Sequence, residues 1–403
     1  MAPARLRHLP PTAVPISVKD VWRGLTALLD PAASLERFRG AIATLTGSES
    51  CFLVSSGRAA LTVTLLALKR LADRTHVVIP AYSCPTVVQS ILAACLEPVF
   101  CDVSPQTLDF DDAALARVMS RRPLAVVPTH LYGLAHRVDH CVDLGRRYGV
   151  FVVEDAAQSF GARIDGQMVG TFGDAGFYSL GRGKCLPVGH GGVIVAGPRL
   201  ASAIVETIRE RFPGRPRRGG AGLAMLLGYG LATRPAGWWV VARSPINPET
   251  EGMDETRLPS VELGVLSSDQ AGVGLSILDR LDRLQASQGR NARRLMAELE
   301  RFDFVTSPKI PPEASPVFLR LPVVVERREL ADRLFRQLWE MGISRSYYRT
   351  LPDLYASRVA SNRGDFPGAS VLAERLLTLP THPYVTDADV ERIAEAFRVV
   401  GAS

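Results

Sequence analysis

The sequence predicts an α/β protein with a mainly parallel central sheet flanked by helices, followed by a smaller α+β C-terminal domain. Between residues 35 and 159, short apolar runs alternate with helical segments. Strands that are apolar throughout indicate a parallel sheet with helices on both faces. After residue 265 the alternation ends and long amphipathic segments follow. A chain of 403 residues is long enough to form one large core and one smaller core.

The elements of the first part can be justified in order. GRAALTVTLLALKRLA (57–72) is an apolar run of helical length, whereas HVVIPAY (76–82) is a short run typical of a buried strand. The same criteria predict helices over 35–46, 57–72, 84–96, 111–120 and 137–149, and strands over 49–56, 76–82, 97–103, 124–133 and 150–159. Ligands of parallel sheets bind at the carboxyl ends of the strands. The polar residues expected at that edge are Ser55, Ser56, Gly57, Arg58, Tyr82, Ser83, His130, Tyr132, Glu154, Asp155 and Gln158.

Three regions are expected along the chain. Residues 1–34 are rich in proline and predict an extended N-terminal arm, and residues 35–265 form the large domain. Residues 266–403 contain a long linking helix and the small domain. The elements expected in this last region are helices over 268–302, 328–343 and 386–400 and a strand over 315–325, with Thr386 as the N-cap of the last helix.

Composition excludes several classes of protein. The formal net charge of +6 suits anionic ligands, and we find no zinc-finger or RNA-binding signature. The six cysteines form no C-x-x-C pair and no metal-binding cluster with histidine, so we expect reduced thiols and no metal. The N-terminus lacks the apolar core of a secretory signal. We therefore expect a cytoplasmic protein.

A single lysine, Lys184, lies in the glycine-rich segment FYSLGRGKCLPVGHGGVIV (177–195). An amine with a lowered pKa forms a Schiff base with a carbonyl cofactor, and glycines allow a flat ring to approach the backbone. Asp155 at a strand end could pair with a pyridine nitrogen. The segment Ser56-Gly57-Arg58 before an apolar helix could bind a phosphate. Each feature alone also has an ordinary explanation, such as a surface lysine or an N-cap, so the prediction depends on their combination.

The chain resembles the DegT/StrS-type family of pyridoxal 5'-phosphate (PLP)-dependent sugar aminotransferases. The resemblance is carried by SSGRAALTVTLLAL, VVPTHLYG, LPTHPYVTDADVERIAEAF and, most specifically, by VVEDAAQSFGARIDGQMVGTFGDAGFYSL followed by the lysine. It implies PLP fold type I, a Schiff base on Lys184 and a contact of Asp155 with the pyridine nitrogen. Cofactor contacts are also implied for Gly57, Arg58, Gln158 and Ser179, and Cys84 takes the place of the usual stacking aromatic residue.

The resemblance also implies a function. Such enzymes transfer an amino group, usually from glutamate, to a keto group of a nucleotide- or lipid-linked sugar in sugar and polysaccharide biosynthesis. They are homodimers with shared sites, but the Asn and Arg that reach the neighbouring site are not found in VELGVLSSDQAG (261–272). A related enzyme acting on a non-sugar or amphipathic substrate, and a non-catalytic PLP-binding sensor, stay open as alternatives. Weaker candidates for substrate contacts are His130, Tyr132, Arg345 and Tyr348.

The main departure from the family is an insert at about 209–246. A basic run is followed by apolar stretches at 221–232 and 238–242, with Thr233-Arg234-Pro235 between them. The basic residues are Arg209, Arg211, Arg215, Arg217 and Arg218. One interpretation is a helix pair buried at a dimer interface. The other is a peripheral contact with the inner face of a membrane, since tryptophan and arginine favour the lipid headgroup region.

Overall fold

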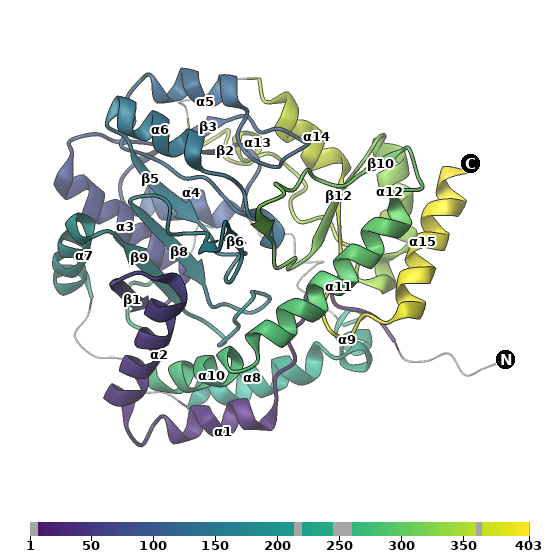
Figure 1. Cartoon of the computed structure of the whole chain (residues 1–403), viewed down its shortest axis with the longest axis horizontal. Helices are drawn as coiled ribbons and strands as arrows, with labels where there is room; N and C mark the ends of the chain where they lie inside the picture. Colours follow the sequence, from purple (N-terminus) through teal and green to yellow (C-terminus); the bar gives the residue numbers. More distant parts are fainter. Residues whose placement is uncertain (1–6, 213–219, 245–259, 360–364, 403) are drawn as a thin grey trace.

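A seven-stranded sheet forms the centre of the molecule (Figure 1). The computed structural model describes residues 7–212, 220–244, 260–359 and 365–402. The strand order is β1-β9-β8-β5-β4-β2-β3. Strands β8, β5, β4, β2 and β3 pair in parallel, and β9 is antiparallel to both of its neighbours. The predicted, mainly parallel sheet is thus confirmed. Its strands are β1 Ser50–Val54, β2 His76–Pro80, β3 Glu97–Cys101, β4 Ala125–Val126, β5 Phe151–Asp155, β8 Ala175–Ser179 and β9 Gly192–Ala196.

Helices cover both faces of this sheet. Val77 and Ile79 of β2 belong to the apolar cluster that includes α3 and α4, whereas Val78 packs with α5 and α6. Successive side chains of a strand point to opposite faces, so these helices lie on opposite sides. The helices of the first part are α1 Val18–Thr26, α2 Pro31–Thr46, α3 Gly57–Leu71, α4 Pro85–Ala93, α5 Asp112–Met119, α6 Asp139–Tyr148, α7 Pro198–Arg211, α8 Ala221–Ala232 and α9 Pro235–Val241.

The C-terminal part is connected through α11, which crosses from α10 toward α12 and α15 (Figure 1). Its antiparallel sheet has the order β10-β12-β13. A third small sheet has the order β11-β6-β7. The strands are β10 Val305–Thr306, β12 Leu321–Val325, β13 Leu376–Leu379, β6 Arg163–Ile164, β7 Gln167–Met168 and β11 Ala314–Ser315, and the helices are α10 Ser268–Leu278, α11 Leu281–Leu299, α12 Arg328–Gln337, α13 Leu351–Leu354, α14 Pro367–Arg375 and α15 Asp387–Gly401.

The N-terminal arm differs from the extended segment we expected. Residues Val18–Thr26 form α1, and α2 begins at Pro31 rather than at residue 35. Ser17 and Asp20 form a capping box, in which each side chain bonds to the backbone nitrogen of the other residue. This reciprocal cap stabilises a short helix that the prolines of the arm had obscured.

The single long helix expected over 268–302 is also corrected, because the chain breaks between α10 and α11. Arg280 lies at the break, and its guanidinium donates 2.7 Å hydrogen bonds to the Pro15 carbonyl and to the Asp20 carboxylate. Periodicity alone could not reveal these contacts with the N-terminal segment. The strand expected over 124–133 is likewise shorter, since β4 ends at Val126 and Tyr132 has the left-handed φ of 59°.

The insert forms the helix pair α8 and α9, and Pro235 occupies the first turn of α9. The positions 213–219 and 245–246 of the insert lie outside the described residues. Helix α8 packs closely on the N-terminal segment, because a Cβ at Gly230 would lie 2.7 Å from Cβ of Ile16. Among the described helices, none combines the length and the apolar character needed to cross a bilayer.

Candidate active site

A cavity of about 260 Å³ lies at the carboxyl ends of β5 and β8. It is close to the lower end of the range of about 300–1,000 Å³ found for small-molecule pockets. The structure brings together around it all of the expected cofactor-binding residues, namely Gly57, Arg58, Cys84, Asp155, Gln158, Ser179 and Lys184. These residues come from five separate segments, which supports the expectation that a parallel sheet collects its polar strand ends at one edge.

Asp155 is the last residue of β5 and is 4% exposed. Burial raises the pKa of its carboxyl group, while a 3.0 Å hydrogen bond from the Ala157 backbone N–H and the nearby charge of Lys184 act in the opposite direction. A cationic N–H partner would stabilise a buried carboxylate in this position, since an opposite charge favours its ionised form. The protonated nitrogen of a pyridine ring is such a partner.

Lys184 lies on the loop between β8 and β9, and the loop is fixed from several sides. Gly183 has the left-handed φ of 71°, and its N–H donates a 2.9 Å hydrogen bond to the hydroxyl of Tyr229 on α8. The Cys185 thiol donates to the Gln158 carbonyl at 3.2 Å. Burial raises the pKa of Cys185 to about 12, so this thiol stays protonated and serves as a donor. Both contacts hold the residues that flank Lys184.

The N-terminus of α3 supplies a site for an anion. The Ser56 side chain caps Ala59 N–H at 3.0 Å, and the Ser56 carbonyl accepts from Ala60 N–H at 2.9 Å. The two preceding N–H groups, of Gly57 and Arg58, have no partner within the helix. A Cβ at Gly57 would lie 3.0 Å from the Ser179 Cβ, so only glycine leaves this corner of the cavity open. The arrangement fits a phosphate group.

The remaining cofactor candidates have partners of their own. Arg58 donates through Nη1 to the Gln89 side chain at 3.3 Å, so its guanidinium is held against α4. The Cys84 sulfur lies 3.0 Å from the Thr86 hydroxyl. In Gln158, the side-chain oxygen accepts from Tyr132 N–H at 3.1 Å, and the side-chain nitrogen donates to the Tyr347 hydroxyl at 3.1 Å.

His130 faces away from the cavity, contrary to the substrate contact we expected. Its side chain is fully buried, and its Nδ1 accepts from His136 N–H at 3.2 Å. Its Nε2 therefore carries the proton and donates to the Glu154 carboxylate at 3.1 Å. Neither ring nitrogen is left for a substrate, so we assign His130 a structural role.

Glu154, which was expected only as part of the polar rim, anchors a loop. Its carboxylate also accepts hydrogen bonds from the N–H groups of Gly170, Phe172 and Gly173 at 2.7, 2.6 and 2.8 Å. Because neighbouring side chains of a strand alternate, Glu154 fixes this loop on one side of β5 while Asp155 faces the cavity on the other. The adjacent acidic residues in EDAAQ were the only sequence signal for this role.

The other three candidates for substrate contacts, Tyr132, Arg345 and Tyr348, differ in their exposure and in their partners. Tyr132 is buried, and its hydroxyl lies 3.2 Å from that of Tyr82. Arg345 forms an ion pair with Asp332 at 2.5 Å and covers the Phe335 ring, which leaves its charge compensated. Tyr348 is 59% exposed, whereas its neighbour Tyr347 is the residue that contacts Gln158.

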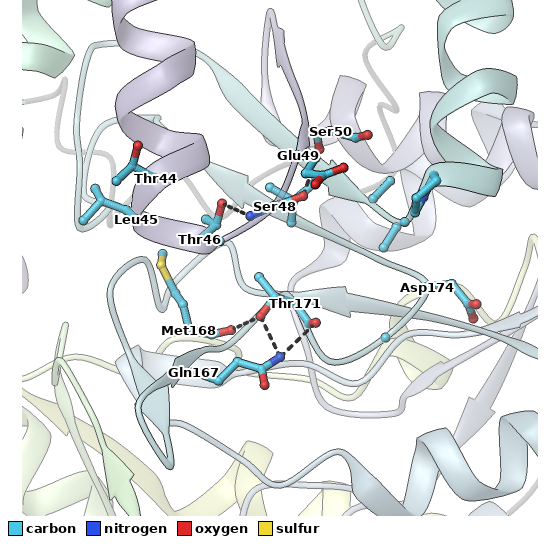
Figure 2. A pocket seen from close by; sticks show the side chains of 18 of the residues that line it. Thr44, Leu45, Thr46, Ser48, Glu49, Ser50, Gln167, Met168, Thr171 and Asp174 are labelled. Atoms are coloured by element: carbon cyan, nitrogen blue, oxygen red, sulfur yellow. Dashed lines mark hydrogen bonds between the residues drawn. The ribbon is translucent and has the colours of Figure 1, made fainter.

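A second and larger cavity, of about 700 Å³, lies at the opposite end of the strands (Figure 2). It is lined by the start of β8 and the end of β9, including Ala175 and Ala196. Its polar groups bond mainly to each other and to the backbone, as Gln167 does with Thr171 and Asp174 with Val152 N–H. It holds no lysine or histidine, so it lacks the reactive groups of the smaller cavity. Within the described ranges, no group of three or more His, Cys, Asp or Glu side chains could hold a metal ion.

Comparison with known proteins agrees with this geometry. Residues 25–218 and 263–398 match the model of the DegT/DnrJ/EryC1/StrS aminotransferase family. The chain is 29% identical over 352 residues to a dTDP-4-dehydro-2,3,6-trideoxy-D-glucose 4-aminotransferase from Saccharopolyspora spinosa, covering 87% of this chain and 84% of the relative. It is 27% identical over 391 residues to the L-glutamine:scyllo-inosose aminotransferase of Streptomyces griseus, covering 91% and 86% of the two chains.

Solved structures share the fold. The sugar aminotransferase CalS13 from Micromonospora echinospora superposes with a TM-score of 0.76 at 25% identity, over 97% of this chain and 99% of that protein. The family match covers most of the chain and includes every segment that forms the cavity. This protein therefore belongs to the DegT/DnrJ/EryC1/StrS aminotransferase family.

Proposed function

We propose that this aminotransferase uses PLP to move an amino group from an amino acid, with glutamate as the leading donor, to a keto group of a sugar. The observation that carries the proposal is that Lys184 and Asp155, 29 positions apart, line one cavity together with the N-terminus of α3. The two relatives described above act, by their names, on a dTDP-linked keto sugar and on scyllo-inosose. A nucleotide- or lipid-linked keto sugar is therefore the acceptor we propose.

The residues present fit this cofactor. Gly57 and Arg58 would hold its phosphate through their backbone N–H groups, helped by the Ser179 hydroxyl. Asp155 would face the ring nitrogen, and Gln158 would contact the ring's hydroxyl side. Cys84, on the rim of the same cavity, would border the ring where an aromatic residue usually stacks. Lys184 would carry the covalent link.

Two groups of this chain account for the reaction. When bound, PLP supplies a ring that withdraws electrons from the reacting carbon. The Asp155 carboxylate would keep the ring nitrogen protonated and so strengthen that effect. Lys184 Nζ, once freed from the covalent link, would take a proton from the donor's α-carbon as general base and return it as general acid.

Two alternatives differ in what the cavity does. An enzyme of the same fold acting on a non-sugar, amphipathic substrate would keep Lys184, whereas a non-catalytic sensor would need only cofactor binding. Binding alone does not require a protonated ring nitrogen, so an acidic residue, Asp155, in the same cavity as Lys184 favours an enzyme. A cytoplasmic location stays a prediction.

We also propose that the outward face of α1 and α8 is covered by a second copy of the chain in a homodimer. Val18, Trp22 and Leu25 follow one stripe of α1 and are 78, 64 and 46% exposed, and Leu29, in the turn after the helix, is 86% exposed. Leu231 of α8 is 52% exposed. Exposed apolar areas of this kind mark contact surfaces. Light scattering of wild type against Trp22→Ala/Leu29→Ala tests the dimer. The alternative is a peripheral membrane contact of the 209–246 insert, which liposome flotation tests. If the wild-type protein is monomeric and floats with liposomes, the membrane contact is favoured over the dimer.

The proposed function is tested by trapping the covalent link. Treatment of the PLP-loaded protein with borohydride, followed by peptide mass mapping, should place the tag on Lys184. Addition of glutamate before reduction should bleach the absorbance of the bound cofactor and abolish the tag. A tag on another lysine would contradict the assignment of Lys184. A stable absorbance that responds to no amino donor would favour the sensor.

A further inference from the structure

A third cavity, of about 470 Å³, lies at the end of the sheet where β5 begins. Its volume is within the range of about 300–1,000 Å³ found for small-molecule pockets. The walls come from the C-terminal end of α3, from α6, from β5, from the loop before β8 and from α7. The charged residues that line it are Arg74, Arg146, Arg199 and Asp174.

The charges of the three arginines are not compensated by strong ion pairs. Arg74 is half-buried, and its Nη1 donates to the Pro123 carbonyl at 2.9 Å, which is a neutral partner. Among the residues that the structure describes, no carboxylate forms an ion pair with Arg74 or Arg199. Arg146 lies 3.8 Å from Asp143, but both side chains are at least 75% exposed, and surface pairs of this kind are weak.

Asp174, the one carboxylate in the lining, is bonded to the backbone instead. Its Oδ2 accepts from Val152 N–H at 2.8 Å, and its own N–H donates to the Val152 carbonyl at 2.9 Å. In the described part of the chain it forms no ion pair with any of the three arginines. Positive charge therefore predominates in this cavity, and a concave site of one sign attracts ligands of the opposite sign.

The rest of the wall is largely apolar. Leu71, Val142, Phe151 and Phe172 line the cavity, and each is only half-buried although it packs against an apolar cluster. An inorganic anion would contact the arginines and leave this apolar surface in water. An organic phosphate would contact the arginines and also cover the apolar surface, which is the more favourable outcome.

The cavity is separate from the cofactor cavity but is connected to it through β5. The strand begins at Phe151 in one cavity and ends at Asp155 in the other, and a strand of this length spans about 13 Å at 3.3 Å per residue. A cofactor on Lys184 therefore leaves the third cavity open. The walls are linked because Phe172 N–H donates to the carboxylate of Glu154, the neighbour of Asp155.

We propose that this cavity is a second binding site, which takes an organic phosphate such as a nucleoside diphosphate. Arg74, Arg146 and Arg199 contact the phosphate oxygens, since the fork of donors on a guanidinium matches phosphate geometry. The apolar wall covers the organic part of the ligand. The inference goes beyond the proposed function, because it gives the protein a place where a phosphorylated metabolite binds without entering the active site.

The test is calorimetry of the PLP-loaded protein with thymidine diphosphate, pyrophosphate and thymidine as three separate probes. Thymidine diphosphate should bind about tenfold more tightly than pyrophosphate, and thymidine should bind most weakly. Arg146→Gln/Arg199→Gln should weaken the binding of thymidine diphosphate at least tenfold. Arg117→Gln/Arg121→Gln is the matched control, because it also removes two exposed arginines but lies outside the cavity, and it should change the affinity less than twofold.

Equal affinities of the wild type and both double variants for thymidine diphosphate would overturn the inference, because the probe would then bind only elsewhere, for example at the active site. Equal affinities for thymidine diphosphate and pyrophosphate would overturn the assignment to an organic ligand. Arg74→Gln, which removes the half-buried arginine, should show the same loss as Arg146→Gln/Arg199→Gln. The double variant changes only exposed side chains, so it still decides the question if Arg74→Gln does not fold.

Discussion

The side-chain nitrogen of Gln158 donates a 3.1 Å hydrogen bond to the hydroxyl of Tyr347, which joins the cavity to the C-terminal part of the chain. The side-chain oxygen of Gln158 accepts from Tyr132 N–H, and its backbone carbonyl accepts from the Cys185 thiol. Gln158 is therefore fixed at its side chain and its backbone. Its orientation depends on the C-terminal part docking against the large sheet.

Tyr347→Phe should weaken cofactor binding as well as stability. The change leaves a side-chain N–H of Gln158 without its partner, which costs about 1–3 kcal/mol where the group is buried. Titration of PLP by absorbance measures the first effect and urea unfolding the second. Tyr178→Phe is the matched control, because its hydroxyl donates to the Val169 carbonyl at 2.7 Å. The control should lose stability but keep cofactor affinity, and equal affinities in both variants would argue against a role for Tyr347 at the site.

Gly57→Ala should reduce affinity for PLP at least tenfold, equivalent to about 1.4 kcal/mol. The new Cβ would lie 3.0 Å from the Ser179 Cβ and displace one wall of the proposed phosphate site. The affinity is measured by dialysis and absorbance. Gly40→Ala on α2 serves as control, since a Cβ there meets no atom within 4 Å. It should leave the affinity unchanged and stabilise the helix by about 0.5–1 kcal/mol.

The cavity was largely predictable from the sequence because its residues end strands or begin helices. Asp155 ends β5, Ser179 ends β8 and Gly57 begins α3, and the topology of a parallel sheet places such positions at one edge. Tyr347 could not be assigned in this way. Its position depends on how the C-terminal part docks, and no local periodicity encodes that docking.

The break between α10 and α11 also could not be predicted from local sequence. The apolar stripe of residues 268–302 predicts one continuous helix, yet Arg280 bonds to Asp20 and Pro15, more than 250 positions earlier. Long-range contacts of this kind override local propensity. The capping box at Ser17, in contrast, was present in the sequence and could have predicted α1.

Glu154→Gln should destabilise the protein strongly although it preserves shape. The carboxylate accepts four hydrogen bonds, and the Nε2–H of His130 is one of the donors. A glutamine has only one acceptor oxygen and would point N–H groups at other donors. His130 cannot adapt by changing tautomer, because its Nδ1 accepts from His136 N–H.

Removing one partner of such a buried charged network costs about 3–5 kcal/mol, so urea unfolding should shift to a much lower midpoint. Glu97→Gln provides the control, since this side chain is exposed and lies 3.6 Å from the exposed His76 ring. A midpoint of Glu154→Gln within the error of the control would contradict the structural role assigned to Glu154.

The pH dependence of stability should depend in part on His136. This side chain is buried, its Nε2 has no partner, and burial lowers its pKa from 6.5 to about 3. The folded protein therefore keeps His136 neutral, whereas the unfolded chain binds a proton below pH 6.5. The stabilising contribution of the neutral His136 side chain is present above pH 6.5, the pKa in the unfolded chain, and is lost as pH falls from 6.5 toward 3. At pH 5 the loss is about 2 kcal/mol, at 1.36 kcal/mol for each unit below 6.5.

His136→Leu should remove this loss. Leucine does not titrate, and it replaces an imidazole whose Nε2 made no hydrogen bond. The free energy of unfolding of the variant should therefore fall about 2 kcal/mol less than that of wild type between pH 8 and pH 5. Urea unfolding at the two pH values measures the difference. His140→Gln, at an exposed position, should retain the wild-type dependence. Parallel curves for wild type and His136→Leu would show that His136 does not stay neutral in the folded protein.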